Sequence, residues 1–92
     1  MRENTDMSAQ PFRLENLMDI LEHKAGLPAA DRVTDERLTL AAIGLDSLAF
    51  LTLQSVLEAR YGFELPDEAM RHRPFADIIA AVNERLEAAN PL

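Results

Sequence analysis

A serine lies within a five-residue stretch whose composition is suited to holding a phosphate. The stretch is Gly44-Leu45-Asp46-Ser47-Leu48, and it joins a segment of small and apolar residues to an amphipathic pattern that begins at Ser47. The first N–H groups of a helix have no partner within the helix and carry the positive end of its dipole. A phosphate attached to Ser47 is therefore favoured, and we interpret this serine as a modification site. The alternative is that Ser47 only caps the helix, as serines often do.

Other residues with reactive side chains form no convincing site. His23 and His72 are far apart, and neither has a carboxylate or a second histidine at a spacing typical of metal ligands. The chain has no cysteine, which removes thiol nucleophiles and cysteine metal sites. Arg71-His72-Arg73 is a short basic segment that could contact an anionic partner or a bound phosphate, although such runs are usually solvated. We expect neither a catalytic nor a metal site.

The size and charge of the chain narrow the classes of function. Its 92 residues suffice for one small domain of a few packed helices, with little room for a deep catalytic cleft. The 16 acidic and 9 basic side chains give a net charge of −7, which repels nucleic acid and anionic lipid and attracts basic protein surfaces. No apolar run is long enough to span a bilayer. We therefore expect a monomeric, cytoplasmic protein that binds neither nucleic acid nor membranes and is not an enzyme.

The hydrophobic pattern predicts an all-α fold. Apolar residues repeat at helical spacing over residues 13–25, and Gly26 ends this first helix. A second helix is expected over residues 47–61, because the same spacing continues until Gly62. Its inward face is expected to contain Phe50, Leu53, Val56, Leu57 and Tyr61.

A short helix and a long helix are expected in the last third of the chain. Segment 65–70 has a proline near its start and acidic residues in its first turn, which favours a brief helical turn. Pro74 can begin the last helix, whose apolar residues repeat until Asn90-Pro91 ends it. The prediction is a four-helix bundle with three long helices and a short third helix.

The segment between the first two helices, residues 27–45, is long for a connection. Within it, Thr39 can cap a single helical turn that runs through Ala42. The side chains expected to anchor this long loop in the core are Val33, Leu38, Leu40 and Ile43. The predicted domain limits are a flexible N-terminal tail at 1–11, the bundle domain at 12–89 and a C-terminal tail at 90–92.

Leu48 and Leu51 lie on a different face of the second helix from its inward residues. The core does not need them, and exposed apolar side chains beside a modification site favour docking of a partner. The alternative is that both pack beneath the long loop and never reach solvent. A small helical adaptor without any modification is the corresponding alternative for the whole protein.

The serine motif and the order of the helices together resemble acyl carrier proteins, whose attachment motif reads Gly-x-Asp-Ser-Leu. The segments that carry the resemblance, which covers about residues 12–86, are Gly44-Leu45-Asp46-Ser47-Leu48, residues 61–68 and Ala81-Val82-Asn83. Residues 46–51, Arg60-Tyr61-Gly62 and Val82-Asn83 look most like the discrete carriers of bacterial aromatic (type II) polyketide synthases. Fatty acid carriers are the nearest alternative. Peptidyl carriers of nonribosomal peptide synthesis usually have Gly-Gly where this chain has Gly44-Leu45.

The resemblance implies that Ser47 is the attachment site of a 4′-phosphopantetheine group. A separate phosphopantetheinyl transferase, which holds the Mg²⁺, would transfer this group from coenzyme A. The thiol of the group would carry acyl chains as thioesters to ketosynthase, malonyl or acyl transferase and tailoring enzymes. Asp46 matches the acid before the serine in the family, where it would help to orient the transferase's metal; alternatively, it is an ordinary N-cap.

The second helix departs from the family at positions where related carriers often have acids. Ala49 and Thr52 stand early in this helix, and Glu58 is its only carboxylate. Charge steering by the helix should therefore be weak, and docking is expected to depend more on Leu48 and Leu51. The acids expected near the short third helix, where they supply negative potential to partners, are Glu64, Asp67 and Glu68.

Overall fold

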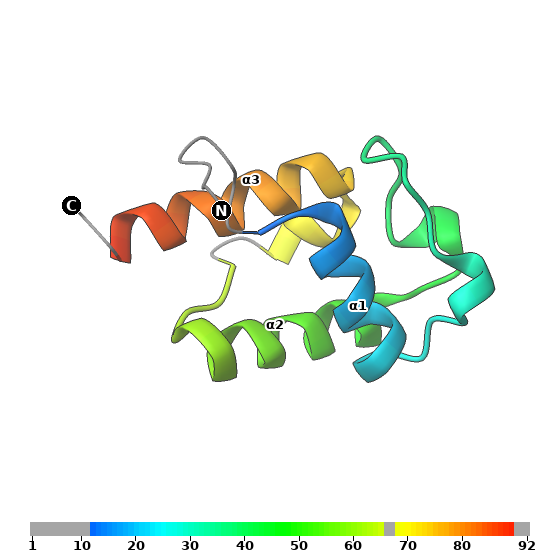
Figure 1. Cartoon of the computed structure of the whole chain (residues 1–92), viewed down its shortest axis with the longest axis horizontal. Helices are drawn as coiled ribbons and strands as arrows, with labels where there is room; N and C mark the ends of the chain where they lie inside the picture. Colours follow the sequence, from blue (N-terminus) through cyan, green and yellow to red (C-terminus); the bar gives the residue numbers. More distant parts are fainter. Residues whose placement is uncertain (1–11, 66–67, 90–92) are drawn as a thin grey trace, which may run out of the picture.

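The computed structural model describes residues 12–65 and 68–89, and these residues form a helical domain. The three α-helices are α1 (Leu14–Lys24), α2 (Ser47–Tyr61) and α3 (Phe75–Ala89) (Figure 1). Three 3-10 segments join them, η1 (Ala29–Asp31), η2 (Ala41–Ile43) and η3 (Glu68–His72). No β-strand occurs within the described ranges, and the all-helical class is confirmed. The expected tails at 1–11 and 90–92 lie outside the described residues.

The prediction of a short third helix, which would make a bundle of four, is not confirmed as an α-helix. The sequence places this element at 65–70, whereas η3 begins at Glu68, ends at His72 and has 3-10 geometry. The Arg73 N–H donates to the Met70 carbonyl at 3.0 Å, an i to i+3 bond of the 3-10 type. The first part of the predicted element, at residues 66–67, lies outside the described residues.

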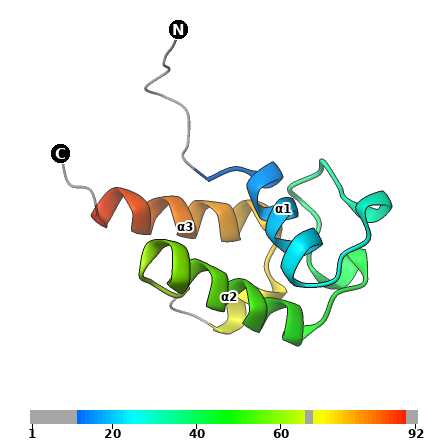
Figure 2. The same cartoon turned by 60° about the horizontal axis from the view of Figure 1, so that its bottom comes forward.

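The three α-helices share one core. Helices α2 and α3 run in roughly the same direction, and α1 lies across the N-terminal part of both (Figures 1 and 2). The segment between α1 and α2 folds against one end of this arrangement. The largest fully buried side chains are Phe12, Leu17, Met18, Ile20, Leu21, Phe50, Leu53, Leu57, Phe75, Ile78 and Val82.

Tyr61 does not belong to the inward face of α2, contrary to the prediction. It is the last residue of α2, and 37% of it remains exposed. Its ring packs edge-on against Phe12, with centroids 6.4 Å apart, and stacks on Phe63 at 6.0 Å. An amphipathic phenol ring suits this boundary, because one side can pack against other rings while the rest stays in water.

The connection between α1 and α2 is not one continuous loop, because it contains η1 and η2. Its apolar anchors are as predicted: Leu40 is buried, and Val33, Leu38 and Ile43 pack against the core. Backbone carbonyls of this connection also accept hydrogen bonds from the start of α3, where the first amides have no partner within the helix. The Phe75 N–H donates to the Leu38 carbonyl at 2.8 Å, and the next amide donates to residue 36 at 2.9 Å.

Asn83 is a polar side chain within the core, only 4% exposed. Its Oδ1 accepts from the Phe12 N–H at 3.0 Å, and its Nδ2 donates to the Phe12 carbonyl at 2.9 Å. Burial of a side-chain amide costs little free energy when its oxygen and nitrogen are both hydrogen-bonded, and much more when they have no partners. Asn83 therefore fixes the segment that precedes α1 against α3.

Candidate functional site

Ser47 is placed by a compact turn that precedes α2. The Thr39 Oγ1 accepts from the Ala42 N–H at 3.2 Å, as predicted, although the turn η2 runs from Ala41 to Ile43 and has Leu40 as its N-cap. Gly44 then takes a positive φ of 82°, a conformation that favours glycine, and the Leu45 N–H donates back to the Leu40 carbonyl at 3.0 Å. The chain reverses within these residues, and α2 begins at Ser47 with its side chain exposed.

Asp46 is the N-cap of α2. Its Oδ1 accepts from the Leu48 N–H at 3.1 Å and from the Ala49 N–H at 3.3 Å. The capping interpretation of Asp46 is therefore confirmed. Two helix amides that were expected to favour a phosphate on Ser47 already have a partner, and that partner is itself an anion.

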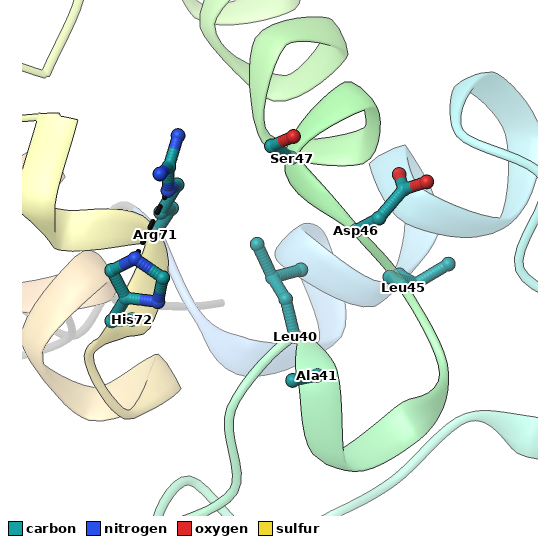
Figure 3. A pocket seen from close by; sticks show the side chains of 7 residues that line it. All are labelled: Leu40, Ala41, Leu45, Asp46, Ser47, Arg71 and His72. Carbon is teal, nitrogen blue, oxygen red and sulfur yellow. Dashed lines mark hydrogen bonds between the residues drawn. The ribbon is translucent and has the colours of Figure 1, made fainter.

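A pocket of about 220 Å³ opens beside Ser47. The residues that line it are Leu40, Ala41, Leu45, Asp46, Ser47, Arg71 and His72 (Figure 3). The last two residues belong to η3 and lie across the pocket from Ser47, whereas Asp46 lies on the other side of the serine. The Arg71 Nε donates to the His72 Nε2 at 3.1 Å. The pocket therefore has an apolar wall and a basic wall.

Leu48 and Leu51 form an exposed apolar surface beside Ser47. Leu48 is 68% exposed and Leu51 is 57% exposed, so neither packs beneath the connection. Ala49 is buried, so this position, where related carriers often have an acid, faces the core in this chain. Thr52 bonds within the helix, because its Oγ1 donates to the Leu48 carbonyl at 3.0 Å.

Of the acids predicted to dock partners, the structure describes the side chains of Glu58 and Glu64. Glu58 is exposed, but it lies eleven residues further along α2, about 16 Å along the helix axis. Glu64 is exposed beyond the end of α2. Glu68 is in η3, and Asp67 lies outside the described residues. The basic residues that line the pocket across from Ser47 are Arg71 and His72 of η3.

The clearest pKa shifts belong to the connection between α1 and α2. Hydrogen bonds from Arg37, through its guanidinium and then its backbone N–H, lower the pKa of Asp35. Hydrogen bonds to Glu22 and then to Asp19 raise the pKa of Arg32. The Arg32 Nη1 lies 2.8 Å from a carboxylate oxygen of each. The two ion pairs of Arg32 hold the connection against α1.

Within residues 12–65 and 68–89, no three His, Asp or Glu side chains gather as a metal site. Over the same residues, no helix is both long enough and apolar enough to cross a membrane. His23 is exposed on α1, and His72 is exposed on η3. His72 is a surface residue, as we expected, but it also lines the pocket beside Ser47.

Sequence reasoning set aside one contribution to the site and missed another. It raised a contact between the basic segment 71–73 and a bound phosphate but favoured a solvated segment, whereas Arg71 and His72 line the pocket beside Ser47. It also missed Gln54, whose Oε1 accepts from the Leu65 N–H at 2.6 Å and whose Nε2 donates to the Leu65 carbonyl at 3.1 Å. Gln54 holds the segment before η3 against α2.

Comparisons with known proteins agree with this geometry. A sequence profile described as a phosphopantetheine attachment site matches residues 15–82. The "Monensin polyketide synthase acyl carrier protein" of Streptomyces virginiae is 36% identical over 87 residues, which cover 90% of this chain and 97% of that protein. The "Anthracycline acyl carrier protein DpsG" of Streptomyces peucetius is 35% identical over 78 residues, or 83% of this chain and 93% of the relative.

A third relative matches over a shorter segment. The "Probable acyl carrier protein" of Streptomyces coelicolor is 48% identical over 44 residues, which span about half of each chain: 48% of this one and 49% of the other. No solved structure gives a significant match. The profile and the longer matches are sufficient to assign the family. The chain belongs to the phosphopantetheine attachment family of acyl carrier proteins.

Proposed function

We propose that the protein carries intermediates of polyketide synthesis on a 4′-phosphopantetheine group attached to Ser47. The observation that carries this proposal is the place of Ser47, exposed at the first residue of α2 and within the matched segment 15–82. Ser55 is the other serine of that segment and lies in the middle of α2. It does not line the pocket beside Ser47.

Attachment requires a hydroxyl group that a separate transferase can reach. The Ser47 Oγ would attack the phosphorus of coenzyme A that bears the pantetheine. A new P–O bond forms as the bond to 3′,5′-ADP breaks, and the hydroxyl proton passes to a base of the transferase. Mg²⁺ held by the transferase would neutralise the pyrophosphate charge during this step. The chain itself contributes the exposed nucleophile.

The residues around Ser47 fit such a group. The pocket offers Leu40 and Leu45 as apolar contacts and Arg71 as a cationic contact. When bound, the group supplies a terminal thiol that holds acyl chains as thioesters, and tethering raises their effective concentration at each partner. Asp46 orders the first turn of α2, and its proposed further role is to assist the transferase's metal.

Partner enzymes are proposed to dock on the exposed Leu48 and Leu51. These side chains lie next to the serine, and being exposed they add little to the packing of the core. The proposed partners are the transferase, a ketosynthase, a malonyl or acyl transferase and tailoring enzymes. The acids proposed as secondary contacts are Glu58, Glu64, Asp67 and Glu68. A monomeric carrier domain over 12–89, working in the cytoplasm, completes this proposal.

Intact-mass spectrometry tests the attachment. The protein is incubated with a promiscuous phosphopantetheinyl transferase, coenzyme A and Mg²⁺, beside Ser47→Ala and the matched control Ser55→Ala. We expect one phosphopantetheine mass increment on the wild type and on Ser55→Ala, and none on Ser47→Ala. An unmodified but folded wild type would contradict the proposal and favour an adaptor.

The cargo is tested with the modified protein. Malonyl loading followed by chain extension with a type II polyketide ketosynthase is the expected result. Extension only by fatty acid ketosynthases would support a fatty acid carrier instead. Loading only by an adenylation domain would indicate a peptidyl carrier.

A further inference from the structure

The charge around Ser47 is unfavourable for a second anion. The Asp46 carboxylate occupies the Leu48 and Ala49 amides, so these cannot bind a phosphate without losing their cap. A phosphodiester on Ser47 would also stand next to that carboxylate in a protein of net charge −7. Like charges at such proximity repel, and the helix N-terminus by itself no longer compensates. A cation from elsewhere in the fold is required.

Arg71 meets this requirement, with His72 beside it. They line the same pocket as Ser47, come from a different element and lie across the pocket from it (Figure 3). A guanidinium has five N–H donors in a planar fork that matches phosphate oxygens. The bond from the Arg71 Nε to the His72 Nε2, at 3.1 Å, orients the guanidinium.

The position of η3 is itself held by the core and by α2. Met70, the residue before Arg71, packs against the hydrophobic core. Upstream, Gln54 of α2 makes two hydrogen bonds to the backbone of Leu65. The basic wall of the pocket is therefore in place before any modification, and little ordering is needed to use it.

We propose that Arg71, oriented by His72, is the anion subsite for the phosphodiester that modification places on Ser47. The inference rests on the proposed attachment at Ser47. Contact with Arg71 directs the first part of the attached arm across the pocket toward η3, beside Leu40 and away from Asp46. Arg71 and His72 act as positioning residues and take no part in bond formation.

NMR of the modified full-length protein tests this inference. The variant is Arg71→Gln, and the matched control is Arg73→Gln, since Arg73 pairs with Asp77 at 3.2 Å and does not line the pocket. Modification of the wild type should shift the Arg71 Nε–H and Leu40 methyl signals. In Arg71→Gln, the Leu40 shift should be largely lost, and the ³¹P signal should move toward that of the same phosphodiester in the urea-unfolded modified protein. Arg73→Gln should behave as the wild type.

Intact mass is recorded on every sample, which separates this inference from the attachment itself. A mass increment with unchanged Arg71 and Leu40 signals would overturn the subsite and leave the attachment standing. A wild type without the increment would overturn both. If Arg71→Gln loses its fold, Arg71→Lys replaces it: the charge is kept but the planar fork is lost, and a reduced Leu40 shift is expected. A ³¹P signal that is the same in wild type and variant would also overturn the subsite.

Discussion

Leucine side chains have opposite environments on the two faces of α2. Leu53 and Leu57 are fully buried in the shared core, whereas Leu48 and Leu51 are exposed to solvent beside Ser47. Each exposed leucine gives up the free energy that burial would supply, about 1.5–3 kcal/mol. The inner face therefore holds the fold together, while the outer face keeps apolar surface available for another molecule. The following changes test that division, in order of expected effect.

The largest contrast should come from truncating one leucine on each face. Leu53→Ala should lower the free energy of unfolding by about 2–5 kcal/mol, because a cavity opens in the core. Leu51→Ala should change it by no more than about 0.5 kcal/mol. Urea unfolding monitored by circular dichroism measures both. If Leu53→Ala does not fold, Ile78→Val offers a milder test, at about 0.5–1.5 kcal/mol. Equal losses for the two leucines would refute the comparison.

Asn83→Leu should also lower the free energy of unfolding, because it removes the hydrogen-bond partners of buried backbone groups. The N–H and carbonyl of Phe12 would both lose their hydrogen bonds, and the expected loss of stability is about 2–4 kcal/mol. The exposed neighbour Glu84→Gln serves as the control and should leave stability within about 0.5 kcal/mol. Chemical denaturation compares the two, and a loss for Asn83→Leu as small as that of the control would contradict the role of the amide.

Asp46 caps the helix that carries both faces, and its substitution should have an intermediate effect on stability. Asp46→Ala removes the acceptor of two amides and should cost about 1 kcal/mol. Asp46→Asn keeps an acceptor oxygen and should retain most of the stability. Thermal unfolding of both variants measures the difference. If Asn costs as much as Ala, the charge stabilises the helix dipole and the cap geometry matters little.

The smallest effect is expected from the surface pair Arg37 and Asp35. Arg37→Gln removes the guanidinium bonds and should raise the pKa of Asp35 toward its ordinary value. Because the folded pKa is the lower one, the pair stabilises the fold above the unfolded pKa, about 4, and this contribution is lost as pH falls through the folded value. NMR titration of the Asp35 carboxyl carbon measures the shift. A pKa unchanged by the substitution would show that the backbone N–H alone lowers it.

Local patterns allowed much of the fold to be predicted. The bounds of α1 and α2, the Thr39 hydrogen bond and the Asp46 cap depend on neighbours along the chain, and the sequence contains them. The exposure of Leu48 depends on what packs over it, and the sequence left two alternatives open. The structure decides between them, because no segment covers this residue.

The remainder depended on contacts between distant segments. The pocket brings Arg71 to Ser47 across an intervening helix and turn, and no short-range pattern encodes that approach. Asn83 interrupts an apolar stripe, which hints at a buried partner but does not identify Phe12. Tyr61 satisfied the helical spacing and still lies at the boundary, because the ends of helices are where periodicity constrains burial least.

The bond between Asn83 and Phe12 also bears on how the chain folds as it is made. Its two ends are 71 residues apart in sequence. During synthesis, which proceeds from the N-terminus, Phe12 emerges early but has no partner for its amide until residue 83 has been added. The segment that is translated first within the domain is therefore among the last to be fixed, and the domain closes only after most of α3 has left the ribosome.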